Sequence, residues 1–263
     1  MIVYMIFTHI YQHLGFTDTR LYMGLEHCLY FFMAWFFFKA GMYFKPSDNK
    51  AMIHKSSKRL LLPFIIWSSI GHIVYCAVHL YQGNLALNMA IPIKQFVMSG
   101  SISGNLPLWF LITLFFCRAL LNWTLSKHIK TFYVTIGSIS IAFILHLIGI
   151  KQPFYIANTA LGLFFMSVGY IEYREKLISI TPVVLLSCVM IYIVGLFYPS
   201  FVGMRSNTLV YGNYLLWSLC SLAGITLFNY VARYRVLEIM GLHYIGRHSM
   251  PIYCAHWIPL LFL

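Results

Sequence analysis

A histidine at membrane depth is the first residue in this chain that could do chemistry. The chain opens with MIVYMIFTHIYQH, an apolar stretch in which His9 lies one or two turns before the end of a predicted helix. A hydroxyl group is a poor nucleophile until its proton is removed, and a neutral imidazole, with an unperturbed pKa of about 6.5, suits that task near neutral pH. His9 is therefore a candidate general base. The alternative is an interior histidine that only hydrogen-bonds a neighbouring helix.

Two further polar residues lie in predicted helices. Glu26 begins the second helix on the same side as His9, where a carboxylate could orient an imidazole or bind substrate hydroxyls, or simply remain solvated. His256 lies in the last helix. At 1.5 Å per residue from Ser249 it would lie about 10 Å inside the cytoplasmic face, with His9 about 10 Å inside the outer face. The hydrocarbon core is about 30 Å thick, so we expect the two imidazoles to remain apart.

The spacing of the potential metal ligands argues against a metal site. His9 and His13 have the i, i+4 spacing of a helical zinc site, but Ile10 stands where that motif needs a glutamate. The six cysteines all lie in apolar segments without CxxC spacing. We therefore expect neither a bound metal nor a disulfide framework.

The composition indicates an integral membrane protein. Of the 263 residues, 60% are hydrophobic and only 9% are charged, whereas soluble domains carry about 25% charged residues. The net charge of +12 is spread over loops between apolar spans, which argues against nucleic-acid binding. Its natural counterpart is the anionic lipid of the inner leaflet, or an anionic cytoplasmic ligand.

The apolar segments predict an all-α, polytopic fold of nine membrane spans that enclose a polar cavity. The segment 85–99 is broken by Pro92 and Lys94, so we interpret it as interfacial or re-entrant, and we expect 99–105 to be a flexible outer loop. The predicted spans are 1–15, 25–44, 60–81, 106–124, 131–149, 153–171, 177–198, 209–230 and 249–263. If the loop 45–59 is cytoplasmic, most of the 18 lysines and arginines lie inside, which predicts a cytoplasmic N-terminus.

Three stretches, in this order, resemble the integral-membrane acyltransferase type 3 family, whose members O-acylate sugars of cell-surface polymers. They are FFMAWFFFKAGMYF with KSSKRLLLPFIIW, then LPLWFLITLFF, then IGRHSMPIYCAHWIP. The resemblance runs from about residue 3 to 260, mainly in hydropathy over 125–240. It implies one membrane-embedded acyltransferase domain over 1–263, with His9 at the position of the family's catalytic histidine.

The resemblance also implies a donor and an acceptor. It predicts transfer of an acyl group, probably acetyl, from cytoplasmic acyl-CoA to a hydroxyl of an extracytoplasmic glycan or lipid-linked sugar. The basic residues Lys55, Lys58 and Arg59 loosely match the family's cytoplasmic Arg-x-x-Arg and would bind the donor phosphates. Trp109 would line the acyl channel, unless it belongs to an interfacial aromatic belt, and His256 would help to hold the thioester.

The ends of the chain depart from the family pattern. Many members carry a basic residue about three helical turns before the catalytic histidine, and here that position falls before Met1. The chain also stops within its ninth predicted span. We expect a chain truncated at both ends, a misplaced start or a diverged member. An inactive remnant is therefore one alternative to an active enzyme, and a small-solute transporter or channel component is another.

Overall fold

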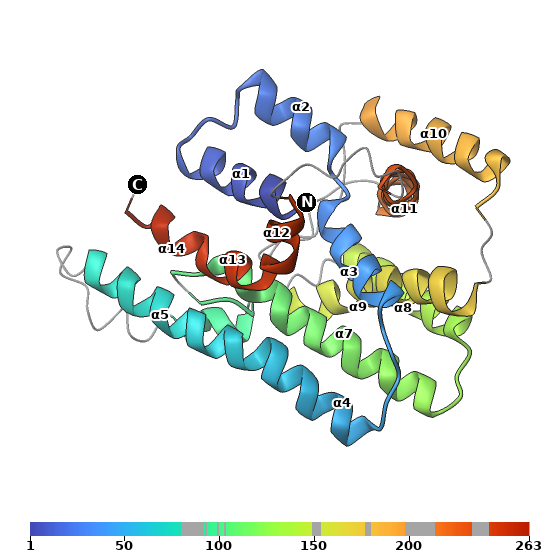
Figure 1. Ribbon diagram of the computed structural model, residues 1–263, viewed down its shortest axis with the longest axis horizontal. Helices are drawn as coiled ribbons and strands as arrows, with labels where there is room; N and C mark the ends of the chain where they lie inside the picture. The colour runs from blue at the N-terminus through green and yellow to red at the C-terminus, as the bar shows by residue number, and fades with distance from the viewer. Residues whose placement is uncertain are drawn as a thin grey trace.

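The computed structural model describes residues 1–79, 92, 94–98, 100–102, 104–148, 154–176, 180–197, 214–232 and 242–262. All regular secondary structure in these ranges is helical, which confirms the all-α prediction (Figure 1). The α-helices are α1 (Ile2–His13), α2 (Arg20–Cys28), α3 (Phe32–Met42), α4 (Asn49–Ser56), α5 (Leu62–His79), α7 (Trp109–Ser126), α8 (Thr131–Ile148), α9 (Phe154–Tyr170), α10 (Pro182–Phe197), α11 (Tyr214–Val231), α12 (Leu242–Arg247), α13 (Ser249–Ala255) and α14 (Trp257–Leu260). Short 3₁₀ or π turns adjoin them at η1 (Ser57–Leu61), η3 (Leu106–Leu108) and η4 (Ile171–Glu175).

Four helical stretches are long and apolar enough to cross a membrane, as expected for a membrane protein. They are Arg20–Met42, Asn49–Val78, Leu106–Ser126 and Thr131–Ile148. Helices also form within the other predicted spans, but their described parts are shorter. The count of nine spans and the polar cavity therefore stay predictions. The segment 85–99 lies largely outside the described residues.

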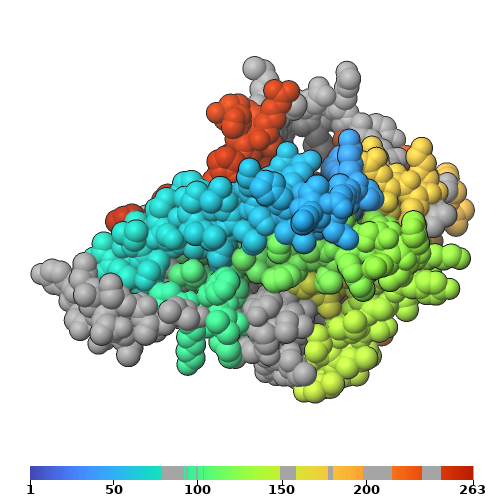
Figure 2. Space-filling model, turned by 90° about the horizontal axis from the view of Figure 1, so that it is seen from below, coloured from blue at the N-terminus to red at the C-terminus, as the bar shows by residue number. Residues whose placement is uncertain are grey.

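The predicted basic loop is helical instead. Helix α4 begins after Asp48 and continues through η1 into α5. The carboxylate of Asp48 accepts a hydrogen bond from the backbone N–H of Ala51 at 3.2 Å. Asp48 is thus a helix N-cap, and no turn residue interrupts the chain after it. In Figure 2 this stretch lies as one ridge along the face in view. The prediction of a loop over 45–59 is therefore wrong beyond residue 48, and the cytoplasmic position of this segment stays a prediction.

The predicted last span is also wrong as a single helix. Residues 242–262 form three short helices, α12, α13 and α14, which change direction at each junction (Figure 1). Pro259 has no N–H to donate to the carbonyl of Ala255, the intrahelical partner four residues earlier. The α-helix accordingly stops at Ala255, and a new turn starts at Trp257.

Helices α3 and α9 pack with their backbones in contact. A Cβ atom added at Gly41 would lie 1.9 Å from the carbonyl oxygen of Met166, and one added at Gly169 would lie 2.2 Å from that of Phe38. Small residues permit this close approach between helices in membrane proteins. The core beside the contact contains side chains that are fully or almost fully buried, among them Phe37, Phe165 and Leu161.

Hydrogen bonds gather several basic segments at one end of the molecule. Asn122 of α7 binds the backbone of Ser47 and the side chain of Asn49, at 2.7–3.1 Å. Arg174 of η4 donates to the carbonyl of Phe44 at 3.2 Å. We call this region the basic end, defined by the exposed side chains of Lys45, Lys50, Lys127, Lys130, Arg174 and Lys176.

Candidate functional site

The structure brings two histidines from opposite ends of the chain into contact. His9 Nδ1 on α1 lies 2.8 Å from His256 Nε2 at the junction of α13 and α14. The two rings are stacked, with centroids 5.1 Å apart and planes 11° apart, and the edge of Trp257 packs against His9. The prediction that these imidazoles remain apart is wrong. The depth count assumed a straight helix from Ser249, and the broken helices do not follow that path.

The hydrogen bonds of the pair determine where its protons lie. His256 Nδ1 is 2.6 Å from the carbonyl oxygen of Tyr253, which can only accept, so Nδ1 carries a proton. In a neutral ring His256 Nε2 then has a lone pair and accepts a hydrogen bond from His9 Nδ1–H. His9 Nε2 is consequently unprotonated. This is the state a general base requires, and the partner ring holds the base in that tautomer.

Contacts to α5 and α7 fix the helix that carries His256. The hydroxyl of Tyr253 donates to the carbonyl of Pro107, just before α7, and its ring packs against Phe110 at 5.8 Å. Asn105 is fully buried, and its Nδ2 donates to the carbonyls of Cys254 at 2.9 Å and Trp67 at 3.4 Å. Asn105 and Tyr253 therefore position His256, a role that the sequence did not predict.

The segment that supplies Asn105 is packed rather than flexible. Ser101 and Asn105 have no exposed surface. Gly104 has a positive φ of 91°, and a Cβ atom there would lie 2.1 Å from the carbonyl oxygen of Gly71 on α5. Only glycine tolerates both the backbone conformation and this approach. The prediction of a flexible loop over 99–105 is wrong for its described residues.

The other residues predicted around His9 lie apart from its hydrogen bonds. Glu26 is half-buried near the end of α2, and the hydrogen bond that orients His9 through Nδ1 comes from His256. The orienting position on His9 belongs to His256, which leaves substrate binding as the predicted role of Glu26. Trp109 is 7% exposed and stands edge-on to Phe110. It is a core residue beside the contact of Tyr253 with α7, not part of an interfacial belt.

A second cluster of cations lies along α4, η1 and α7. Lys55, Lys58 and Arg59 are exposed on one helical stretch. From α7, the half-buried Arg118 donates through Nε to Ser56 Oγ at 3.2 Å, and its guanidinium lies 5.3 Å from the centre of the Phe44 ring.

This cluster has the character of an anion site. Within the described ranges no carboxylate pairs with Arg59 or Arg118. Like charges held together without a counter-ion favour binding of an anion, and guanidinium groups suit phosphate oxygens. Arg118 lies within the predicted span 106–124. Its approach to η1 depends on how α4 and α7 pack. The π turn that carries Lys58 and Arg59 belongs to a class of distortion frequent at functional sites.

Helix α7 connects the two sites. Its start holds Tyr253 through Pro107, and Arg118 lies eleven residues further along, or about 16 Å at 1.5 Å per residue. The histidine pair and the cation cluster therefore lie at different levels along α7. The cluster is the nearer of the two to the basic end.

Comparison with known proteins was made at three levels. A family model described as an acyltransferase domain matches residues 1–263. Searches of curated proteins and of solved structures gave no match. Because the family model covers the whole chain, the protein belongs to the acyltransferase type 3 family.

Proposed function

We propose that the protein transfers an acyl group, probably acetyl, from acyl-CoA to a hydroxyl of an extracytoplasmic glycan or lipid-linked sugar. Family membership supports acyl transfer. The observation that carries the finer proposal is the contact between His9 and His256, which leaves His9 Nε2 as an unprotonated nitrogen. We place the basic end and the N-terminus in the cytoplasm of a multi-pass protein, following the distribution of lysine and arginine.

The reaction is one proton transfer coupled to one acyl transfer. His9 Nε2 removes the proton of the acceptor hydroxyl while the oxygen attacks the thioester carbonyl carbon. The C–S bond then breaks, and the proton passes from His9 to the leaving thiolate, which gives an ester and free CoA. While His9 is cationic, its Nδ1–H bond to His256 is charge-assisted and therefore stronger. His256 is thus a positioning residue that also stabilises the charged state of His9.

The cation cluster would hold the donor. Arg59 and Arg118 would bind its phosphates, with Lys55 and Lys58 as additional point charges. The pantetheine arm would run along α7 from this cluster towards the histidine pair, and Trp109 lies at the far end of that path. Glu26 would bind hydroxyls of the acceptor. These assignments place the phosphates of the donor at the cation cluster and its thioester at the histidine pair, the two sites that α7 connects.

The test is ester formation by the reconstituted full chain. Acetyl-CoA and a maltooligosaccharide are supplied, and free CoA thiol and O-acetyl ester are measured. General base catalysis contributes about 10²–10⁴ in rate, so His9→Ala should lower ester formation at least 100-fold. His13→Ala, one turn along the same helix and exposed, is the control and should retain activity. Equal activity of His9→Ala and the unchanged protein would reject the proposal.

A further inference from the structure

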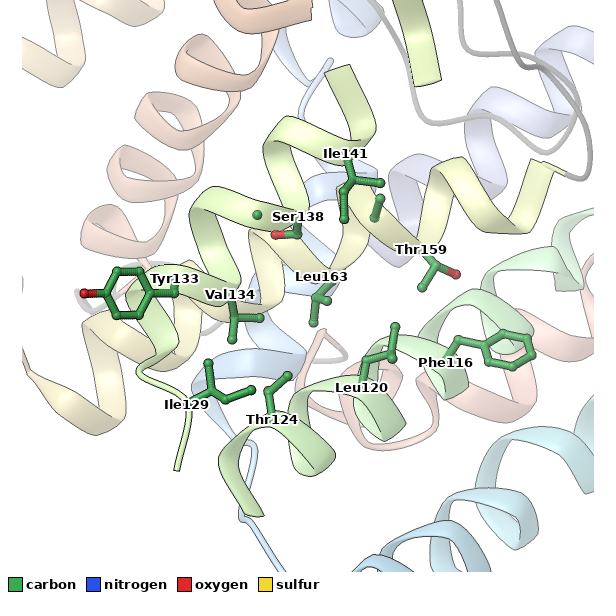
Figure 3. Close-up of a pocket in the computed structure, with 12 residues that line it drawn as sticks. Phe116, Leu120, Thr124, Ile129, Tyr133, Val134, Ser138, Ile141, Thr159 and Leu163 are labelled. Atoms are coloured by element: carbon green, nitrogen blue, oxygen red, sulfur yellow. The ribbon is translucent and has the colours of Figure 1, made fainter. Parts of the chain in front are cut away.

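A hollow separate from the histidine pair lies between α7 and α8, with α9 as its floor. Its volume is about 540 Å³, within the range of small-molecule pockets. Figure 3 shows the side chains of Leu120, Val134 and Leu163 converging on it from the three helices. We call it the α7–α8 groove. Its full lining is Phe116, Leu120, Thr124, Ile129, Tyr133, Val134, Gly137, Ser138, Ile141, Thr159, Ala160 and Leu163.

The walls of the groove present apolar surface. The hydroxyl of Thr124 donates to the carbonyl of Leu121, and that of Ser138 donates to the carbonyl of Thr135. These two hydroxyls are thus satisfied within their own helices, whereas the buried hydroxyl of Thr159 has no hydrogen-bond partner among the described residues. Phe116, Leu120 and Ile141 each expose 39–53% of their surface. Because α7 and α8 are each long and apolar enough to span a bilayer, an apolar groove between them would open to hydrocarbon chains rather than to water.

The groove runs along one helix for most of the depth of one leaflet, which is about 15 Å, half of the hydrocarbon core. It follows α8 from Tyr133 to Ile141, eight residues or about 12 Å. Because α8 is long and apolar enough to cross a membrane, a ligand lying along it would run across the bilayer, as lipid chains do.

One end of the groove carries the groups expected at a lipid headgroup. Thr124 and Ile129 bracket this end; the exposed Lys127 lies in the turn between them, and the exposed Lys130 directly follows Ile129. Trp123 and Tyr133 are 50% and 63% exposed beside the same turn, and such aromatic residues concentrate at the membrane interface. The carboxylate of Glu175 is engaged by the hydroxyl of Thr131. Arg174 and Lys176 flank it, so positive charge prevails.

We propose that the α7–α8 groove binds one acyl chain of an anionic phospholipid from the leaflet at the basic end. The chain would lie along α8, and the phosphate would lie between Lys127 and Lys130. A lysine near an anionic surface contributes about fivefold in affinity, so the two lysines together should favour an anionic over a zwitterionic lipid about 25-fold.

Gly137 allows a sharp test because it lines the groove and has no heavy atom within 4 Å of a Cβ added to it. Gly137→Phe would fill the groove without a clash at the backbone and would improve the helix propensity of α8. Ile136→Phe adds the same ring one residue earlier, about 100° around the helix, at an exposed position outside the lining. It is the matched control.

The probe is a phosphatidylglycerol with a photoreactive diazirine in its acyl chain, placed with the full chain in phosphatidylcholine nanodiscs. Peptide mapping should find label on the groove lining. Gly137→Phe should lower this labelling at least tenfold, Ile136→Phe should leave it unchanged, and Lys127→Gln with Lys130→Gln should lower it towards that of a phosphatidylcholine probe. Equal labelling by the two lipids, or labelling that Gly137→Phe does not alter, would overturn the proposal. Gel filtration of each variant would establish that it remains folded.

Discussion

Substitutions of His256 can distinguish a role in positioning His9 from a role in packing alone. His256→Leu keeps an apolar side chain beside Trp257 but removes the acceptor of His9 Nδ1–H. His256→Gln keeps an acceptor, because the amide oxygen of glutamine reaches the position of the imidazole Nε2. The two variants therefore differ in one hydrogen bond to the proposed base. Both leave the contacts of Asn105 and Tyr253 to the backbone and to α7 in place.

The size of the effect follows from the contact. A buried donor left without its acceptor costs about 1–3 kcal/mol, and 1.36 kcal/mol corresponds to a factor of ten in rate. His256→Leu should therefore lower kcat about five- to 150-fold. His256→Gln should lose less than about fivefold. The acceptor KM should change little in either, because His256 holds the base rather than the substrate.

The assay is steady-state ester formation from acetyl-CoA with a maltooligosaccharide, with gel filtration to establish folding of each variant. Our interpretation requires that glutamine restores most of the activity that leucine removes. Equal kcat for the leucine variant and the unchanged protein would refute the hydrogen-bond argument. Equal losses in both variants would instead show that His256 acts through something other than an acceptor atom.

Two further predictions concern the donor site and the packing of the helices. Arg59→Gln combined with Arg118→Gln should weaken acetyl-CoA binding at least about 100-fold, since hydrogen bonds to charged groups contribute about 1.5–3 kcal/mol each and 1.36 kcal/mol corresponds to a factor of ten. This loss of affinity should become smaller at high salt, and the control Lys176→Gln should bind acetyl-CoA as the unchanged protein does. Unaltered binding of the double variant, measured by calorimetry, would contradict the prediction. Gly41→Val should destabilise the protein by about 1–3 kcal/mol or more, because the new Cβ meets the backbone of α9. Gly137→Ala, with open space around it, should be neutral or stabilising, and similar melting temperatures for the two variants would contradict the close packing.

The fold class and the family were predictable from the sequence because both depend on local patterns. Long apolar helices follow from hydropathy alone, and the stretches around Trp109 and His256 carry the family resemblance. The two histidines could not be paired in this way. Their contact depends on the changes of direction at the two junctions between α12, α13 and α14. Pro259 is visible in the sequence and marks one of these breaks, but its effect on the path of the chain is tertiary.

The cation cluster likewise combines residues that local patterns could indicate with one that only tertiary packing brings in. The family resemblance implied Lys55, Lys58 and Arg59 as candidates, although they lie on a helix rather than in a loop. Asp48 at the start of that helix was a local signal that could have corrected the prediction. Arg118 joins the cluster only because α7 packs against α4 and η1, sixty residues away in the chain. Such long-range contacts leave no periodic pattern in a single sequence.

The most direct test of the central claim is sided acyl transfer in sealed proteoliposomes. Acetyl-CoA, which does not cross the bilayer, is supplied on one side, and a maltooligosaccharide is enclosed on the other. We predict O-acetyl ester on the enclosed sugar when the basic end faces the donor, and its loss in His9→Ala. Ester formed only when donor and sugar share one side, or formed equally by His9→Ala, would contradict a histidine base that serves an acceptor across the membrane from acyl-CoA.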